Sequence, residues 1–340
     1  MRVTVVGAGL AGTLLAWRLR ALRPDVRLTL VTGLRRPDAT GASGGLVRGF
    51  ETGAAQAELA AESLAELSAS PLLRGWSGYQ EIGSVVLLPD PPDQRCVRPV
   101  EDLLPGSLRL LDGNALGGTL PFRGLPAGVV GVVERRAGFL SPALFRDRVL
   151  DALRAEGVRI VDRPASRVTP TAEVVCADGT TVDADVTVLA VGAWTPSFLA
   201  ASGLDGQGLR TKQIQYTRFP VTLPALGAFV DDTTGLYGRP VGREAFLLGV
   251  PGDTWDVAPD ATAPDPALVR RLSRCVKERL GVQPVAGSST ASFDCYADEG
   301  GLRLRPVRGA QRVLTFTGGS GGAAKTALAA SRRAARALPT

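Results

Sequence analysis

The chain opens with a glycine pattern that few folds accommodate. Residues 3–6 form an apolar, mostly β-branched run (Val-Thr-Val-Val) that leads directly into Gly7-Ala8-Gly9-Leu10-Ala11-Gly12. A helix-forming stretch follows as far as Leu22, and residues 28–31 (Leu-Thr-Leu-Val) form a second apolar run. A strand, a GxGxxG turn, a helix and a strand within about thirty residues form the βαβ unit that binds a dinucleotide. The sequence therefore predicts an α/β domain at the N-terminus.

The glycines of this turn have separate tasks. Gly7 permits the tight turn, Gly9 lets the backbone approach a pyrophosphate, and Gly12 lets the helix and strand pack closely. The free N–H groups at the helix start then receive the phosphates. The candidate residues of this segment are Gly7, Gly9, Leu10, Ala11 and Gly12.

The end of the second run departs from the usual dinucleotide pattern. Thr32 stands where an acidic residue commonly binds the ribose hydroxyls. Arg35 and Arg36 follow, an arrangement that suits the 2′-phosphate of NADP. The threonine hydroxyl is still able to make one ribose hydrogen bond. This segment alone leaves both FAD and NADP open.

Composition narrows the class of protein. A chain of 340 residues is too long for one compact core and fits two domains. It contains no histidine, which removes the usual general base and the usual metal ligand, so we expect no metal. The 4 cysteines are far apart and form no CxxC pair, which is typical of reduced thiols in the cytoplasm.

The charge pattern does not predict a macromolecular or lipid partner. The net charge is +6, but the basic residues are scattered along the chain, so we expect no nucleic acid as partner. No apolar stretch is long enough to span a bilayer, so we expect no membrane association.

Three further segments rich in small residues occur along the chain. The first, residues 39–48, contains Ala42, Ser43, Gly44 and Gly45 and ends at Arg48. The second follows the apolar run 186–191 and contains Gly192 and Trp194. The third follows the apolar run 313–317 and leads into an alanine-rich helix; it consists of Gly318, Gly319, Ser320, Gly321, Gly322, Ala323, Ala324 and Lys325. Small residues suit a backbone that lies against a planar ring and phosphates.

In this order the motifs resemble the D-amino-acid oxidase superfamily of FAD enzymes, which includes glycine oxidase and monomeric sarcosine oxidase. The resemblance covers nearly the whole chain. It implies an α/β fold in which a Rossmann-like FAD-binding domain of the glutathione-reductase type carries a discontinuous antiparallel-sheet substrate domain. The FAD-binding domain is expected at residues 1–75, 137–205 and 290–340, and the substrate domain at 76–136 and 206–289.

The resemblance also assigns roles to the small-residue segments. It places FAD against the GxGxxG turn, Thr32 and all three segments, including Gly319, Ser320, Gly321, Gly322 and Ala323. Lys325 would bring positive charge to the flavin ring, where it stabilises the anionic reduced form.

Candidate substrate residues follow from the same resemblance. The segment Gly301-Leu302-Arg303-Leu304-Arg305-Pro306 is similar to a Gly-Leu-Arg-Pro segment whose arginine binds the substrate carboxylate, with two residues inserted. We expect Arg303 or Arg305 to act as that clamp, one of them pointing toward the flavin and the other away, because a guanidinium fits a carboxylate bidentately. Tyr296 and Arg48 are the other candidates for contact with substrate.

Two departures from the family affect the cofactor and the electron acceptor. Asp294 stands where sarcosine oxidases carry the cysteine that attaches flavin, so we expect noncovalent FAD. Leu247 stands where those enzymes carry a lysine that activates oxygen, so the acceptor is either oxygen or another molecule.

The expected function is oxidation of the C–N bond of a small amino acid or N-substituted amino acid to an imine, by hydride transfer to flavin. This chemistry needs no strong protein base, in agreement with a histidine-free chain. An NADP-dependent dehydrogenase, a flavin-dependent monooxygenase and a flavin-binding protein without turnover are the alternatives.

Overall fold

The computed structural model describes residues 1–33, 38–206, 208–260, 262–285 and 287–338. Arg35 and Arg36, on which the NADP alternative depends, lie outside the described residues. The N-terminal βαβ unit forms as predicted, from β1 (Arg2–Val6), α1 (Leu10–Leu22) and β2 (Arg27–Thr32), and the two strands pair in parallel. Gly7 has a φ of 106°, a conformation that side chains rarely adopt.

The contact between α1 and the preceding turn requires glycine. A Cβ atom on Gly12 would lie 2.0 Å from the carbonyl oxygen of Gly7. The helix therefore crosses the turn more closely than any side chain permits, which is the packing role expected of Gly12.

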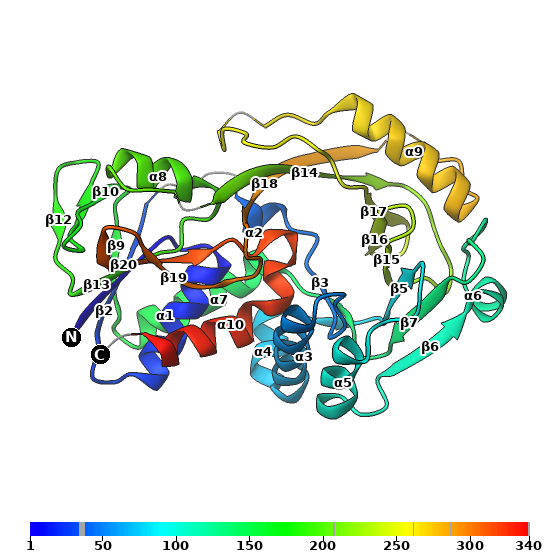
Figure 1. Ribbon diagram of the computed structural model, residues 1–340, viewed down its shortest axis with the longest axis horizontal. Coiled ribbons are helices and arrows are strands. Elements are labelled where there is room, and N and C mark those ends of the chain that lie inside the picture. The colour runs from blue at the N-terminus through cyan, green and yellow to red at the C-terminus, as the bar shows by residue number, and fades with distance from the viewer. Residues whose placement is uncertain (34–37, 207, 261, 286, 339–340) are drawn as a thin grey trace.

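Six strands form the first sheet of the described chain (Figure 1). They are parallel except for the edge strand β19, which runs antiparallel to β20. The order is β19 (Arg303–Val307), β20 (Ala310–Thr317), β13 (Val186–Leu189), β1, β2 and β9 (Arg159–Asp162).

Both faces of the first sheet are covered, which explains why its strands are nearly continuous apolar runs. One face packs on α1, α7 (Pro142–Ala155) and α10 (Ala323–Ala337). The other face packs on α8 (Thr195–Ala201) and on a small antiparallel sheet of β10 (Ala165–Val168), β11 (Val174–Cys176) and β12 (Thr181–Val182).

The second sheet has eight strands within the described residues and is largely antiparallel. Only β15 and β5 pair in parallel among its neighbours in that part of the chain. The order is β18 (Ser288–Ala297), β14 (Leu209–Phe219), β17 (Ala245–Gly249), β16 (Leu236–Val241), β15 (Ala228–Asp231), β5 (Ser84–Leu88), β7 (Val130–Glu134) and β6 (Leu108–Asp112).

Helices cover the second sheet as well. One hydrophobic cluster joins α9 (Pro266–Leu280) to the sheet, and another joins α3 (Ala54–Ala69) and α5 (Gln94–Leu103) to it. The remaining elements are α2 (Ala39–Ala42), β3 (Leu46–Val47), α4 (Pro71–Ser77), β4 (Gln80–Glu81), α6 (Gly113–Thr119), β8 (Gly138–Phe139), η1 (Gly192–Trp194) and η2 (Ser320–Gly322). This architecture confirms the predicted α/β fold class with a largely antiparallel second sheet.

The expected domain boundary at residue 290 falls inside a strand. β18 pairs with β14 along its whole length, from Ser288 to Ala297. Residues 290–297 therefore lie in the second sheet, because the backbone hydrogen bonds of β18 are made there. No helix of the described chain is long and apolar enough to cross a membrane.

Candidate active site

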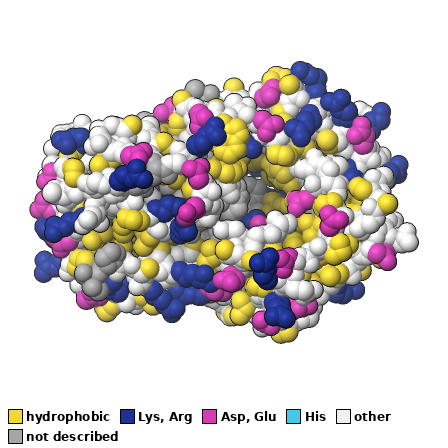
Figure 2. All heavy atoms as spheres, in the orientation of Figure 1, with side chains coloured by type: hydrophobic (Ala, Val, Ile, Leu, Met, Phe, Trp, Pro, Cys, Tyr) yellow, Lys and Arg dark blue, Asp and Glu magenta, His cyan; other side chains and the backbone are white. Residues whose placement is uncertain are grey.

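A cavity of about 1950 Å³ lies between the two sheets. Figure 2 shows the molecule hollowed near the middle of one face. Loops at the strand ends of the first sheet line one side of the cavity, and β14, β16 and β18 contribute to the other side. Pockets for drug-sized ligands usually enclose roughly 300–1,000 Å³, so this cavity has room for a larger ligand together with a small one.

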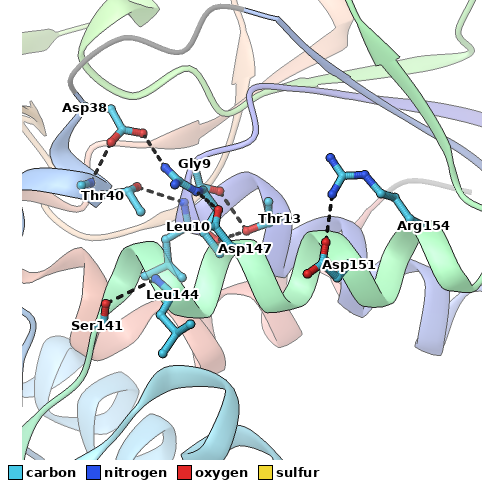
Figure 3. Close-up of polar contacts among 12 residues, drawn as sticks. Gly9, Leu10, Thr13, Asp38, Thr40, Ser141, Leu144, Asp147, Asp151 and Arg154 are labelled. Carbon is cyan, nitrogen blue, oxygen red and sulfur yellow. Dashed lines mark hydrogen bonds and ion pairs between the residues drawn. The ribbon is translucent and has the colours of Figure 1, made fainter.

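The start of α1 faces this cavity without a side-chain cap. Its N-cap residue is Gly9, and Leu10 donates its backbone N–H to the hydroxyl oxygen of Thr40 at 3.1 Å. Thr40 belongs to α2, whose N-cap Asp38 accepts the N–H of Gly41 at 2.7 Å. Figure 3 shows Asp38 and Thr40 beside Gly9 and Leu10. The segment 39–45 is therefore tied to a helix N-terminus that is able to bind an anion.

Two groups at the ends of neighbouring strands line the cavity beside this turn. Thr32 ends β2, and Asp162 ends β9 in register with it. The acidic group expected at position 32 is thus present on the adjacent strand. Asp162 was not predicted from the sequence, although its place at the end of a short apolar run, Ile160-Val161, was a usable signal.

Trp194 presents an unused hydrogen-bond donor. Its indole Nε1 is buried and has no hydrogen-bond partner among the described residues. Its ring lies edge-on to Phe293 of β18, with 5.3 Å between the ring centroids. Both residues line the cavity. A buried donor without a partner costs free energy, so a ligand that supplies an acceptor here would be stabilised.

Arg48 and Lys325 meet at the cavity wall on one carboxylate. Glu51 Oε1 lies 2.8 Å from Arg48 Nη2 and 2.6 Å from Lys325 Nζ. Burial alone would raise the pKa of Glu51, but the two cations outweigh it and hold that pKa below its ordinary value. Burial, with Arg48 adding to it, lowers the pKa of Lys325 to about 8 although Glu51 opposes the shift.

Glu134 holds the segment that carries this cluster. It is fully buried on β7 and accepts the backbone N–H groups of Gly49 at 2.8 Å and Phe50 at 3.0 Å. Burial raises the pKa of Glu134, against the effect of these two hydrogen bonds. Glu51 and Glu134 were not predicted from the sequence, because neither lies in a recognisable motif.

The second sheet gives the cavity an aromatic wall. Tyr216, Tyr237 and Tyr296 all line it, on β14, β16 and β18. Burial raises the pKa of Tyr296 to about 12 and also raises the pKa of Tyr237. Tyr296 packs edge-on against Trp255, with 5.1 Å between the ring centroids. Asp294 lies on the same wall.

Most of the predicted site residues line this one cavity. They are Gly7, Gly9, Leu10, Ala11, Thr32, Ala42, Ser43, Gly44, Gly45, Arg48, Gly192, Trp194, Tyr296, Gly319, Ser320, Gly321, Ala323 and Lys325. Gly12 and Gly322 are not among the residues that line it. Gly12 packs on Gly7, and a Cβ atom at Gly322 would lie 3.0 Å from Cε of Lys325.

The expected arginine clamp is not placed at the cavity. Neither Arg303 nor Arg305 is among its lining residues, because β19 is the edge strand of the first sheet. Arg303 pairs with Glu299. Arg305 donates to the backbone carbonyls of Thr317 at 2.9 Å, Glu299 at 2.7 Å and Gly301 at 2.8 Å. Arg303 and Arg305 both lie in the regular part of β19, because its register shift comes after Pro306. A bulge that would point the two side chains in opposite directions is therefore not present between them.

Arg305→Lys is therefore expected to affect stability rather than substrate binding. A lysine offers its N–H donors from a single nitrogen and cannot reproduce the spacing of Nη1 and Nη2, which together reach the three carbonyls. The loss should be about 1–3 kcal/mol in the free energy of unfolding. Arg303→Lys should change that free energy by less than about 0.5 kcal/mol, because its side chain is exposed. Urea denaturation measures both variants, and equal stabilities would contradict the structural role of Arg305.

The comparison with family models covers almost the entire chain. Residues 2–337 match the model of the DAO family, described as FAD dependent oxidoreductase. The chain belongs to this family. It is therefore an FAD-dependent oxidoreductase, and the resemblance noted in the sequence is confirmed. The NADP-dependent alternative is set aside. No curated protein sequence matches the chain.

Solved structures of a dehydrogenase and of two oxidases share the fold of this DAO-family chain. L-proline dehydrogenase from P. horikoshii superposes with a TM-score of 0.82 at 13% identity, over 98% of this chain and 92% of that one. Glycine oxidase from Geobacillus kaustophilus superposes with a TM-score of 0.77 at 16% identity, over 100% of this chain and 96% of that one. Iminodiacetate oxidase from Chelativorans sp. superposes with a TM-score of 0.75 at 17% identity, over 100% of this chain and 96% of that one.

The cavity of this DAO-family chain fits the family's cofactor. Thr40 binds the N–H of Leu10, and the next N–H groups at the start of α1 are left to a pyrophosphate. A Cβ atom on Gly9 would approach the Thr40 hydroxyl, at 3.3 Å. The backbone there is open to a close ligand. The buried Nε1 of Trp194 also calls for an acceptor that the described chain does not supply.

Proposed function

We propose that this chain oxidises the C–N bond of an amino acid or N-substituted amino acid to an imine. The observation that carries the proposal is the pair of cations at the cavity wall, Arg48 and Lys325, which share the single carboxylate of Glu51. These three groups together carry one positive charge, and the carboxyl groups of Asp232 and Glu134 interact with the cations without pairing with them directly. A carboxylate beside them would neutralise that charge, and such a group is present in every amino acid.

Arg48 has donors left for this task. Its Nε donates to the carbonyl oxygen of Phe50 at 3.0 Å and its Nη2 pairs with Glu51. Its Nη1 makes no hydrogen bond to a residue in the described part of the chain. A guanidinium held on one side in this way is preorganised to bind a carboxylate with the other. With Arg303 and Arg305 away from the cavity, Arg48 becomes the leading candidate for the clamp.

The cofactor-binding residues follow from the same geometry. The GxGxxG turn and the start of α1 would hold the pyrophosphate of FAD, and Thr32 with Asp162 would bind a ribose. When bound, FAD would supply the acceptor of a hydride, which carries both electrons of the oxidation. Lys325 would add electrostatic stabilisation, and the aromatic wall would exclude water from the substrate.

FAD is expected to be bound noncovalently. The purified protein should be yellow, and heat or acid should release FAD into the supernatant, because Asp294 stands at the position of the attachment cysteine. Absorbance of the supernatant and of the precipitated chain measures the two fractions. Colour that stays with the denatured chain would contradict the noncovalent mode.

The substrate class is tested by anaerobic bleaching of the flavin. A panel of amino acids, N-methyl amino acids and simple amines is mixed with the holoenzyme without oxygen. We expect amino acids or their N-substituted forms to bleach the flavin, and simple amines to do so weakly. Equal bleaching by amines that lack a carboxylate would contradict the proposed role of Arg48.

A further inference from the structure

Asp294 presents a buried carboxyl group to the cavity without a partner. The residue is only 6% exposed, and its Oδ2 is buried with no hydrogen-bond partner in the described chain. It lies against η2, since a Cβ atom on Gly321 would be 3.3 Å from Oδ2. Leaving a buried carboxyl group without a partner costs free energy. The site is therefore incomplete until a ligand brings a donor to it.

The charged and titratable groups around Asp294 do not neutralise it. Lys212 is directly opposite on β14, but its Nζ lies over the rings of Trp255 and Tyr296, at 4.6 and 5.9 Å from their centroids. On α10, Lys325 pairs with Glu51 instead. Tyr216, Tyr237 and Tyr296 face the same cavity, and η2 contributes only serine and glycine. Burial raises the pKa of Asp294 to about 7.

Asp294 also differs in position from the other acids of the cavity. Asp38, Asp147, Asp151 and Asp162 line it from α2, α7 and β9, on the side where the dinucleotide turn lies. Among the described residues, Asp294 is the one carboxyl group that the second sheet contributes to the cavity lining. The chain has no histidine to take its place.

We propose that Asp294 accepts the proton that the substrate's ammonium group must lose before its C–N bond is oxidised. The inference rests on the proposed function, since it assigns a proton path within that same site. Amino acids reach the enzyme mainly as ammonium ions at neutral pH, whereas hydride leaves from the carbon next to a neutral amine.

The step is an acid–base transfer and needs no oxidant. An N–H bond of the ammonium group breaks, its electron pair stays on nitrogen, and an O–H bond forms on the carboxylate of Asp294. The ammonium group also provides the donor that the buried carboxyl lacks. Asp294 takes no proton from carbon, so the reaction still requires no strong base.

Asp294→Asn tests the proposal, because it keeps the shape and removes the proton acceptor. The substrate is an N-methyl amino acid, whose amine has a pKa near that of lysine, about 10. The variant depends on the small fraction that arrives already neutral. Anaerobic bleaching at pH 7 should slow on the order of 100-fold, and the rate should rise with pH toward the substrate's own pKa.

A measurement without substrate separates this role from a structural one. The flavin absorbance of the oxidised holoenzyme, titrated from acid to alkaline pH, should show a transition near pH 7 from Asp294 in the wild type. Asp294→Asn should lose that transition and keep the one near pH 8 that belongs to Lys325. Asp298→Asn is the matched control, because Asp298 is exposed just beyond the end of β18 and does not line the cavity. It should behave as the wild type in both experiments.

A second variant guards against a folding defect. Asp294→Ala leaves space for a small carboxylate, and added formate should restore part of the bleaching rate if the missing group is a proton acceptor. An unchanged pH profile in Asp294→Asn, or no rescue of Asp294→Ala by formate, would overturn the proposal while leaving the proposed function intact. If no compound of the panel bleaches the wild-type flavin, the proposed function and this inference fall together.

Discussion

Gly9→Val is expected to give a folded protein without colour. The φ of Gly9 is −70°, which any residue adopts, and a Cβ atom there would approach only the Thr40 hydroxyl, at 3.3 Å. The neighbour that must give way is a side-chain hydroxyl, that of Thr40, and not the backbone. The branched carbons of valine would occupy the space of the pyrophosphate, and an overlap costing about 3 kcal/mol weakens FAD binding by roughly 100-fold.

The measurement compares FAD content with folding. The ratio of flavin to protein absorbance should fall sharply, while circular dichroism and the melting curve stay close to those of apoprotein prepared from the wild type. Gly12→Ala is the contrasting variant, because its Cβ atom would lie 2.0 Å from the carbonyl oxygen of Gly7 and the fold must distort. A Gly9→Val protein that retains yellow FAD would show that the pyrophosphate lies elsewhere.

Lys325→Met is expected to slow flavin bleaching without unfolding the protein. Methionine keeps most of the length and removes a charge buried beside the cavity. Losing one electrostatic donor should raise the barrier by about 1–3 kcal/mol, a slowing of about 5- to 150-fold. The reduction potential of the flavin should also fall, since negative charge on the reduced ring is less well stabilised.

The contribution of Lys325 to the wild-type bleaching rate should fall as the pH rises, because Lys325 loses its charge. Because burial lowers the pKa of Lys325 to about 8, its cationic form is lost as the pH rises through 8. The component of the wild-type bleaching rate that depends on this charge should decline over that range, and Lys325→Met should show no such decline. Lys277→Met is the control, because Lys277 is exposed on α9. If Lys325→Met leaves both rate and potential unchanged, Lys325 does not act on the cofactor.

The sequence by itself determined the fold class and the glycine turn that lines one end of the cavity. The positive φ at residue 7 favours glycine there, and the close contact of residue 12 with the carbonyl oxygen of Gly7 requires glycine at position 12. Both requirements arise within one short segment. Such constraints are local, so a motif expresses them directly. The strands β1, β2, β13 and β20 could also be predicted from local sequence, because strands buried on both faces need continuous apolar residues.

Only the tertiary structure decided which charged groups meet at the cavity. Glu51 reaches Lys325 of α10, and Glu134 of β7 binds the backbone at Gly49 and Phe50, across segments far apart in the chain. No spacing rule predicts such contacts. Arg303 and Arg305 show the converse, because a motif placed them near substrate while the pairing of β19 at a sheet edge directs their side chains to other partners.

The raised pKa of Asp294 could not be predicted from the sequence either. Its neighbours Phe293 and Cys295 in the chain do not explain its pKa, whereas burial of its side chain, which lies against η2, does. Desolvation depends on every segment that packs around a group, and those segments come from distant parts of the chain. A motif records which residue is present, and the packed structure decides whether water reaches it.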